Sequence, residues 1–156
     1  MTRAVTRLEV TVSNRQRALR VSAAEVTRAA AAAARYAGGP SGRLSVVLVG
    51  DRKMRGLNRR FAHCLGTTDV LAFDLSDKGR GAREDISGEV VVNASLARVE
   101  AARRGKKSLD ELLLYVVHGV LHLGGYRDGG AAERHRMRAA EAAVMKGLRL
   151  HRTVRP

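Results

Sequence analysis

The sequence predicts an α+β fold, in which a small mixed β-sheet of about four strands packs with about five helices. Two observations lead to this fold class. Short apolar segments with strand character fall in the first two-thirds of the chain, whereas long helical segments dominate the remainder. A chain of 156 residues with 45% hydrophobic residues is also long enough to bury one sizeable core. We therefore expect residues 1–156 to form a single domain.

Two strands and a long helix are expected at the start of the chain. Alternating apolar residues indicate a strand over residues 8–12, and a run of Val and Leu indicates a buried strand over residues 43–49. Between them, Ser22 and Glu25 form a capping-box pattern that begins an alanine-rich helix. This helix is expected to stop at the Gly-Gly-Pro of residues 38–40.

The middle of the chain alternates between short strands and helices. Asp51 is expected to cap a short helix that runs to about Phe61. The elements expected after it are a strand over 69–73, a polar glycine-containing loop over 74–85, a strand over 89–92 and a helix over 94–104.

The last third of the chain is predicted to be helical. A second capping-box pattern, from Ser108 to Glu111, is expected to open an apolar helix over residues 109–123. A final helix is expected over residues 132–148, followed by a frayed basic tail over 151–156.

The composition favours a polyanionic partner. Lys and Arg number 29 against 15 Asp and Glu, which gives a net charge of +14, and Arg suits phosphate because its planar fork binds two oxygens. We therefore expect contact with nucleic acid; solvated charges from a genome-wide Arg bias are the alternative. Three Tyr and two Phe are too few for an extended base-stacking platform.

The chain is expected to act in the cytoplasm without a membrane partner. A single cysteine, Cys64, cannot form an internal disulfide, which fits a reducing compartment. The first residues lack the apolar core of a signal peptide, and no apolar run reaches the roughly 20 residues that a membrane span needs.

Two histidines, His118 and His122, stand four residues apart in the predicted helix over 109–123. Residues at i and i+4 share one face of a helix, with Cβ atoms roughly 5–6 Å apart, so both imidazoles can bind one cation. The helix is apolar on most sides and is expected to be buried, where polar rings need partners. We therefore predict metal binding; two ordinary hydrogen-bonded helix histidines are the alternative.

A third ligand is expected beyond Gly124-Gly125, a pair that permits a turn with positive φ. Asp128 follows this turn closely enough to return toward the histidines, although it could instead cap the last helix. His135 is a rival ligand and His151 a weaker one. Three protein ligands with one open position are typical of a catalytic zinc site. We expect one Zn²⁺ per chain, although these ligands suit other divalent transition metals as well.

The segment lacks the general base of the zincin peptidases. Their motif is His-Glu-x-x-His, and Gly119 stands where that motif carries its Glu. Carboxylates elsewhere are candidates for a base, namely Glu111, Glu89 and Asp69, and the sequence does not choose among them.

Residues 118–128 resemble the signature of the YbeY family of metal-dependent endoribonucleases, His-Gly-x-Leu-His-Leu-x-Gly-Tyr-Asp-His. The matching positions are His118, Gly119, Leu121, His122, Leu123, Gly125 and Tyr126. Leu57-Asn58 and the segments 68–73 and 88–92 resemble further family motifs in the same order. The residues that resemble the family's closing helix are Glu133, Met137, Glu141 and Leu148. The likeness covers about residues 44–148.

This resemblance implies a zincin-like metal helix that ends in a zinc site of three ligands. It also implies an edge strand over residues 68–73, beside a positively charged cleft for RNA. Thr68 and Asp69 would order the wall of this cleft and are candidate substrate-binding residues.

Two positions depart from the family signature. Asp128 replaces the third histidine ligand and remains a competent ligand, with Arg127 at the family's Asp position. The arginine that the family carries after Leu-Asn-x-x-aromatic, which is implicated in RNA cleavage, falls at Ala62. The nearby residues that could substitute are Arg59, Arg60 and His63, of which Arg60 and His63 are the candidate catalytic residues and Arg59 a candidate substrate-binding residue.

The predicted function is that of a metal-dependent hydrolase, an endoribonuclease that prefers single-stranded RNA. The resemblance implies a role in 16S rRNA maturation at the 3′ end and in ribosome quality control, with ribosomal RNA and the small ribosomal subunit as partners. Two alternatives stay open: a ribosome-associated RNA-binding protein with a structural metal, and another zinc-dependent hydrolase such as a peptidase.

Overall fold

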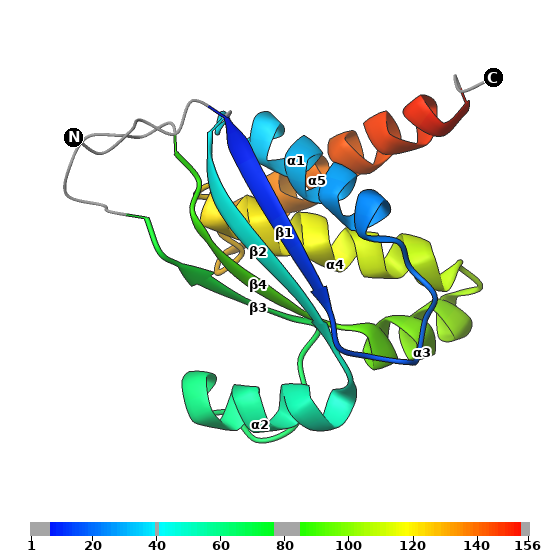
Figure 1. Ribbon diagram of the computed structural model, residues 1–156. Helices are drawn as coiled ribbons and strands as arrows, with labels where there is room; N and C mark the ends of the chain where they lie inside the picture. Colours follow the sequence, from blue (N-terminus) through cyan, green and yellow to red (C-terminus); the bar gives the residue numbers. More distant parts are fainter. Residues whose placement is uncertain (1–6, 40, 77–84, 154–156) are drawn as a thin grey trace.

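The computed structural model describes residues 7–39, 41–76 and 85–153, in which a four-stranded sheet packs with five helices (Figure 1). The elements in chain order are β1 (Leu8–Asn14), α1 (Ala23–Tyr36), β2 (Gly42–Val49), α2 (Asp51–Ala62), β3 (Val70–Asp74), β4 (Gly88–Asn93), α3 (Ala94–Arg104), α4 (Ser108–Leu123) and α5 (Ala131–Thr153). The predicted fold class is confirmed.

The sheet is mixed and has the strand order β1-β2-β4-β3. Strands β1, β2 and β4 run parallel to one another, whereas β3 runs antiparallel to β4, with Val70 opposite Val92 and Ala72 opposite Val90. Strand β3 therefore forms one edge of the sheet, as the resemblance implies for this segment.

Helices cover both faces of the sheet, which explains why the central strands are apolar on both sides. Val90 and Val92 of β4 belong to the large core that is shared with α1, α4 and α5. Val91, on the opposite face, packs with Val49 and with Met54 of α2 in a smaller core. Figure 1 shows α2 apart from the other helices, on its own side of the sheet.

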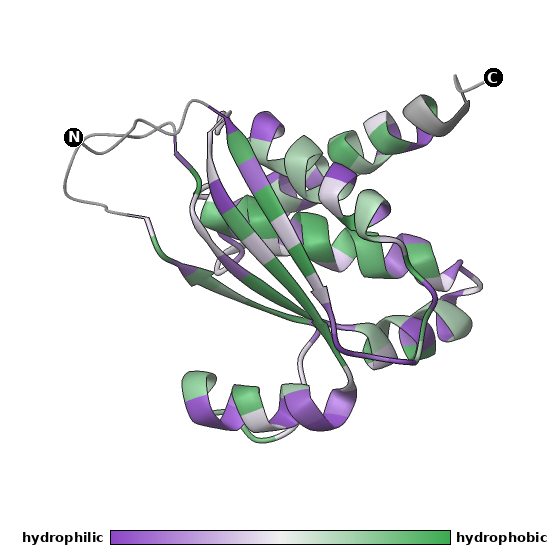
Figure 2. Ribbon diagram, viewed as in Figure 1, coloured by the Kyte–Doolittle hydropathy of each residue, from purple (hydrophilic) through white to green (hydrophobic). Residues whose placement is uncertain are grey.

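Helix α4 is the centre of the larger layer. It packs against α1, α3 and α5 and against strands β3 and β4. The fully buried side chains that it contributes include Leu112, Val116, Val117, Val120 and Leu121. Figure 2 shows this helix as mostly hydrophobic, in contrast to the mixed surface of α2.

The alanine-rich helix α1 begins as predicted. The Ser22 hydroxyl accepts a hydrogen bond from the Glu25 backbone N–H at 3.1 Å and donates one to the Glu25 carboxylate at 3.1 Å. Alanines, among them Ala30 and Ala33, fill its buried face, and their small side chains let α1 approach its neighbours closely.

Two predicted N-caps are wrong. Gly50 caps α2, so Asp51 is its first residue, and its carboxylate binds Arg55 and Asn93 instead of the helix N-terminus. Lys107 occupies the N-cap of α4 and no side chain makes a cap hydrogen bond there, because the Glu111 side chain is turned into the protein interior.

The last helix is longer than predicted. Helix α5 continues to Thr153, past the end expected near Leu148, because Arg and Leu are good helix formers and neither Gly nor Pro follows Gly147 before that point. Residues 154–156 of the expected frayed tail, and residues 77–84 of the expected polar loop, lie outside the described residues. Across the ranges that are described, no helix has both the length and the apolar character required to cross a membrane.

Candidate metal centre

Helix α4 lies unusually close to the sheet at Gly119, between the two histidines. A Cβ atom at Gly119 would lie 2.5 Å from Val90 Cγ1 and 2.9 Å from Val70 Cγ2, so any side chain would force the helix away from β3 and β4. The residue type at this position thus sets the distance between helix and sheet. His118 and His122 flank it and remain at the partly exposed rim of the core.

A glycine turn ends α4 and redirects the chain. The Gly125 N–H donates to the His122 carbonyl at 3.1 Å, and the Tyr126 N–H donates to the Leu121 carbonyl at 3.0 Å, which is the hydrogen-bond pattern of a Schellman motif. Gly125 has φ +101°, in the left-handed region that glycine adopts without strain. The predicted positive-φ turn is present, and it returns the chain toward the end of α4.

Three candidate ligand atoms converge beyond this turn. His118 Nε2 and His122 Nε2 are 2.9 Å apart, and Asp128 Oδ2 lies 3.5 Å from the first and 3.3 Å from the second. Zinc binds such atoms at about 2.0–2.2 Å, so two ligands of a tetrahedral ion are separated by about 3.3–3.6 Å. The triangle is close to one face of that tetrahedron. Within the described part of the chain, this is the cluster of three residues that could hold a metal ion.

A partly buried carboxylate orients the first histidine. Glu141 Oε1, on α5, lies 2.5 Å from His118 Nδ1 and accepts its proton, so Nε2 carries the lone pair that can bind a metal. Burial lowers the pKa of the His118 imidazole, but the hydrogen bond and charge of Glu141, together with the charges of Asp69 and Asp128, outweigh burial and raise that pKa above its usual value. Glu141 therefore holds the ring in one orientation.

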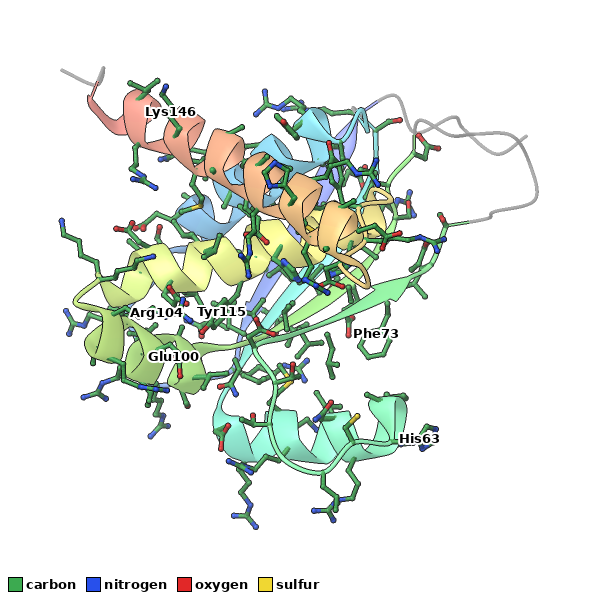
Figure 3. All side chains as sticks on the ribbon, turned by 180° about the vertical axis from the view of Figure 1, so that it is seen from behind. His63, Phe73, Glu100, Arg104, Tyr115 and Lys146 are labelled. Carbon is green, nitrogen blue, oxygen red and sulfur yellow. The ribbon has the colours of Figure 1, made fainter. Side chains whose placement is uncertain are left out.

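A groove runs along α4 between α3 and α5, and we refer to it as the α4 groove. It consists of two adjoining hollows that share Glu111, Leu114, Arg138 and Glu141. The hollow of about 420 Å³ also includes His118, Tyr115 and Asp69 in its lining. Figure 3 shows Tyr115 together with Glu100 and Arg104 where α3 meets α4.

Cations gather along the α4 groove. The basic side chains that line it are Arg104, Lys106, Lys107, Arg138 and Arg149. Glu100 forms ion pairs with Arg103 and Arg104, at 3.0 and 3.7 Å respectively. The acidic side chains that line the same groove are Asp69, Glu100, Asp110, Glu111 and Glu141. The groove therefore offers cations near a candidate metal ligand, together with an equal number of carboxylates.

Thr68 and Asp69 lie at the start of β3, on the wall of this region. Asp69 lines the hollow that contains His118, and its Oδ1 accepts from the Val70 N–H at 2.8 Å and from the Thr68 hydroxyl at 3.3 Å. The fully buried Asn93 holds the preceding loop by donating to the Thr68 carbonyl at 3.2 Å. The structure thus brings Asp69 and His118 to one hollow.

The other predicted site residues are not brought to the cluster. Arg59, Arg60 and His63 are exposed at the end of α2, on the face of the sheet opposite α4. Figure 3 shows His63 at the tip of α2, across β3 from α4. Arg60 stacks over Phe61 at 5.2 Å, and Phe61 contacts Phe73 of β3 edge to face.

The rival ligands and the candidate bases are scattered. His135 is exposed on α5 and does not belong to the cluster, and the side chain of His151 lies outside the described residues. Glu89 precedes Val90 on β4 and therefore faces the α2 side of the sheet. Glu111 is buried in the α4 groove.

Sequence reasoning did not identify the role of Glu141. It lies 23 residues after His118 on a helix with one other carboxylate, Glu133, and no local spacing marks it as the partner of the histidine. Its only signal was its place in the resemblance to the closing helix of the family.

The fold is a mixed sheet with a buried helix, and two histidines near the end of that helix meet a carboxylate from the loop that follows. Such an arrangement defines a protein that can hold a metal ion at the edge of its core. The model of the family described as "Endoribonuclease YbeY" matches residues 7–149. The chain therefore belongs to the YbeY endoribonuclease family, as the sequence predicts.

Relatives with this name cover nearly the whole chain. The Endoribonuclease YbeY of Geobacter metallireducens is 31% identical over 140 residues, which are 88% of this chain and 93% of that protein. That of Pelotomaculum thermopropionicum is 36% identical over 152 residues, which are 93% of this chain and 100% of that protein. The solution structure of TM1509 from Thermotoga maritima shares the fold, with a TM-score of 0.60 at 19% identity, over 90% of this chain and 88% of that chain.

Proposed function

We propose that this protein is a metal-dependent endoribonuclease that cuts single-stranded RNA. It forms a single domain, and it acts in the cytoplasm on ribosomal RNA of the small subunit, in 3′ end maturation of 16S rRNA and in ribosome quality control. Membership of the YbeY endoribonuclease family supports the activity. The observation that carries the proposal is the triangle of ligand atoms from His118, His122 and Asp128, which is close to the size that one metal ion requires.

Zinc is the proposed metal, with one ion per chain. Two imidazole nitrogens and one carboxylate oxygen form the donor set of many catalytic zinc sites, and the partial exposure of His122 leaves room for a substrate. When bound, the ion supplies Lewis acidity to a phosphate oxygen and to water. Glu141 keeps the His118 ring in the orientation that presents Nε2, and Asp128 reduces the positive charge of the site.

The α4 groove is the proposed binding site for the RNA backbone. Five basic side chains line it beside five carboxylates, and the basic ones can neutralise phosphates next to the metal cluster. Asp69 and Thr68 order the wall of the hollow that contains His118. We propose that Arg59, Arg60 and His63 bind RNA that passes beyond β3, while the catalytic assignment of Arg60 and His63 stays a prediction.

Gly119 argues against a peptidase mechanism. A Glu at this position would act as the base of a zincin, but a side chain here would collide with Val90 and Val70. A second candidate function, RNA binding with a structural metal, is supported by the exposed Ala62 at the position of the family's arginine.

Metal content measured by mass spectrometry tests the site first. We expect about one zinc per chain in the wild type, loss of metal in His118→Ala, His122→Ala and Asp128→Ala, and unchanged metal in the exposed control His135→Ala. A wild-type protein that stays metal-free after reconstitution with zinc contradicts the proposal.

Cleavage of a labelled single-stranded RNA tests the activity. We expect cleavage that a chelator abolishes, that zinc restores and that His118→Ala lacks. Tight, salt-sensitive RNA binding that persists in His118→Ala, without metal-dependent cleavage by the wild type, would instead identify the RNA-binding alternative. Cleavage that ignores chelators would refute the proposed use of the metal.

A further inference from the structure

Glu111 is a buried carboxylate with an unused acceptor atom. Its side chain is 3% exposed, and Oε2 has no hydrogen-bond partner among the described residues. The other oxygen lies 3.8 Å from Nη1 of Arg104, a side chain that is itself 56% exposed. The hydroxyl of Tyr115 also interacts with the Glu111 carboxylate, and burial together with this carboxylate raises the pKa of that hydroxyl. A buried carboxylate without full partners is costly, so a native protein that retains one has a reason to do so.

The position of Glu111 relates it to the metal cluster. Glu111, Tyr115 and His118 follow one another at i, i+4 and i+7 along α4, so they share a face that opens into the same hollow. Since each residue of a helix rises ~1.5 Å, Glu111 lies about 10 Å along the axis from His118. That distance is too long for Glu111 to take a proton beside the metal. A nucleotide with its phosphate at the metal would instead place its base in the part of the hollow that Glu111 lines.

The remaining lining of the hollow suits a nucleobase. Leu96 and Leu114 supply apolar walls, and Tyr115 supplies a largely buried aromatic ring. Arg104 and Arg138 also line the hollow and can bind neighbouring phosphates. The carboxylates that line the hollow are Asp69, Glu100, Glu111 and Glu141, and among them Glu111 has the buried oxygen that no described residue satisfies. Apolar and aromatic walls around an unsatisfied acceptor, with basic side chains nearby, suit a base that is splayed out from single-stranded RNA.

We propose that this hollow binds a guanine base of the RNA substrate, with Glu111 accepting hydrogen bonds from the Watson–Crick edge of guanine; the inference rests on the proposed function. Guanine carries two adjacent N–H donors on that edge, at N1 and N2, and a carboxylate can accept both. Cytosine and adenine each present one amino donor beside a ring acceptor, and uracil has its single N–H between two carbonyl groups. Glu111 is therefore the specificity-determining residue.

The test compares matched single-stranded RNAs of one sequence, in which each guanine in turn is replaced by inosine. Inosine keeps the N1–H but lacks the N2 amino group. We expect one position near the cleaved bond at which inosine lowers kcat/KM about tenfold or more, as for the loss of a charge-assisted hydrogen bond. In Glu111→Gln this discrimination should fall to within about threefold, while metal content stays unchanged. Glu9→Gln, which removes a carboxylate from the far edge strand, serves as the control and should keep the full discrimination.

A second measurement separates this inference from the proposed function. Calorimetric titration with guanosine and inosine monophosphates should show weaker binding of the inosine compound to the wild type, and no difference in Glu111→Gln. If the protein binds guanosine monophosphate in this manner but cleaves no RNA, the pocket stands and the proposed function fails. Cleavage without discrimination at any guanine overturns the pocket and leaves the proposed function intact.

Thermal unfolding excludes a purely structural role for Glu111. Removal of a poorly paired buried charge should leave the melting temperature of Glu111→Gln equal to or above that of the wild type. A large fall in melting temperature, together with retained discrimination between guanine and inosine, would show that Glu111 stabilises the fold and does not bind the base.

Discussion

The end of α4 and the end of α2 carry the two groups of residues that sequence analysis assigned to the site, and they are built differently. At the end of α4, His118 contacts Glu141, and a Schellman turn returns Asp128 to the histidines. At the end of α2, Arg60 and His63 are exposed, and the main contacts there are aromatic ones of Phe61. The candidate metal ligands are thus held by contacts from neighbouring elements, whereas Arg60 and His63 face the solvent.

Loss of the Glu141 side chain, which supports His118 near the end of α4, should have the largest effect, and the quantity affected is the metal affinity. Glu141→Ala frees the His118 ring, and loss of such a partner typically lowers metal affinity about 10–100-fold. Competition with a zinc indicator measures the change. Glu141→Gln retains an acceptor for the Nδ1 proton and should recover part of the affinity, so equal losses in both variants would contradict a role through hydrogen bonding.

Two glycine substitutions compare the helices directly. Gly119→Ala places a Cβ 2.5 Å from Val90, so we expect a loss of about 1–3 kcal/mol in the free energy of unfolding and weaker metal binding. Gly56→Ala on α2 meets no atom within 4 Å and should stabilise the protein by about 0.5–1 kcal/mol through helix propensity. Urea unfolding of both variants measures the two free energies. A Gly119→Ala variant that is more stable than the wild type would show that α4 can move away from the sheet without cost.

Substitutions at the two ends of α2 should also differ in their effects, with a change in stability at the N-terminal end and a change in RNA binding at the C-terminal end. At the first end, hydrogen bonds from Thr67, Arg55 and Asn93 lower the pKa of Asp51 to about 2. A carboxyl with a depressed pKa stabilises the folded state above its unfolded pKa of 3.8, and this contribution disappears as the pH falls toward 2.

Asp51→Asn should therefore destabilise the protein at pH 7, by about 1 kcal/mol once solvent screening of this partly exposed group is allowed for. The difference in unfolding free energy from the wild type should shrink between pH 4 and about pH 2. A difference that is independent of pH would mean that the charge of Asp51 contributes little.

The far end of α2 should give the smallest effect. The double variant Arg60→Ala and His63→Ala is expected to raise KM for RNA about two- to threefold and to reduce the salt dependence of binding by a slope of about 0.7 for each phosphate that the protein no longer neutralises. Steady-state kinetics at several salt concentrations would measure both quantities. A fall in kcat of tenfold or more, with metal content unchanged, would instead support the catalytic assignment of these two residues.

The fold and the ligand triangle could be predicted because their signals are local. Alternation and apolar runs mark the strands, and the spacing of His118 and His122 followed by two glycines marks the place where Asp128 returns. Such patterns depend on backbone geometry over a few residues, which the sequence expresses directly.

The contacts between distant segments could not be predicted. Glu141 reaches His118 from another helix, and Glu111, expected to complete a capping box with Ser108, instead turns into the α4 groove. In both cases tertiary packing decides where a carboxylate points, and a local motif, as at Ser108, is overruled. The same limit applies to Arg60, whose separation from α4 depends on the side of the sheet that α2 covers.

The ligand triangle joins the end of α4 to the loop before α5, and Glu141 adds α5 itself to the same assembly. An ion held there would act as a removable cross-link between the two helices, present only in the folded state. Binding at a free concentration 100 times the dissociation constant adds about 2.7 kcal/mol to the stability of a folded protein. Metal supply would then set the lifetime of this protein against proteolysis as well as its activity, so that metal-starved cells lose both together.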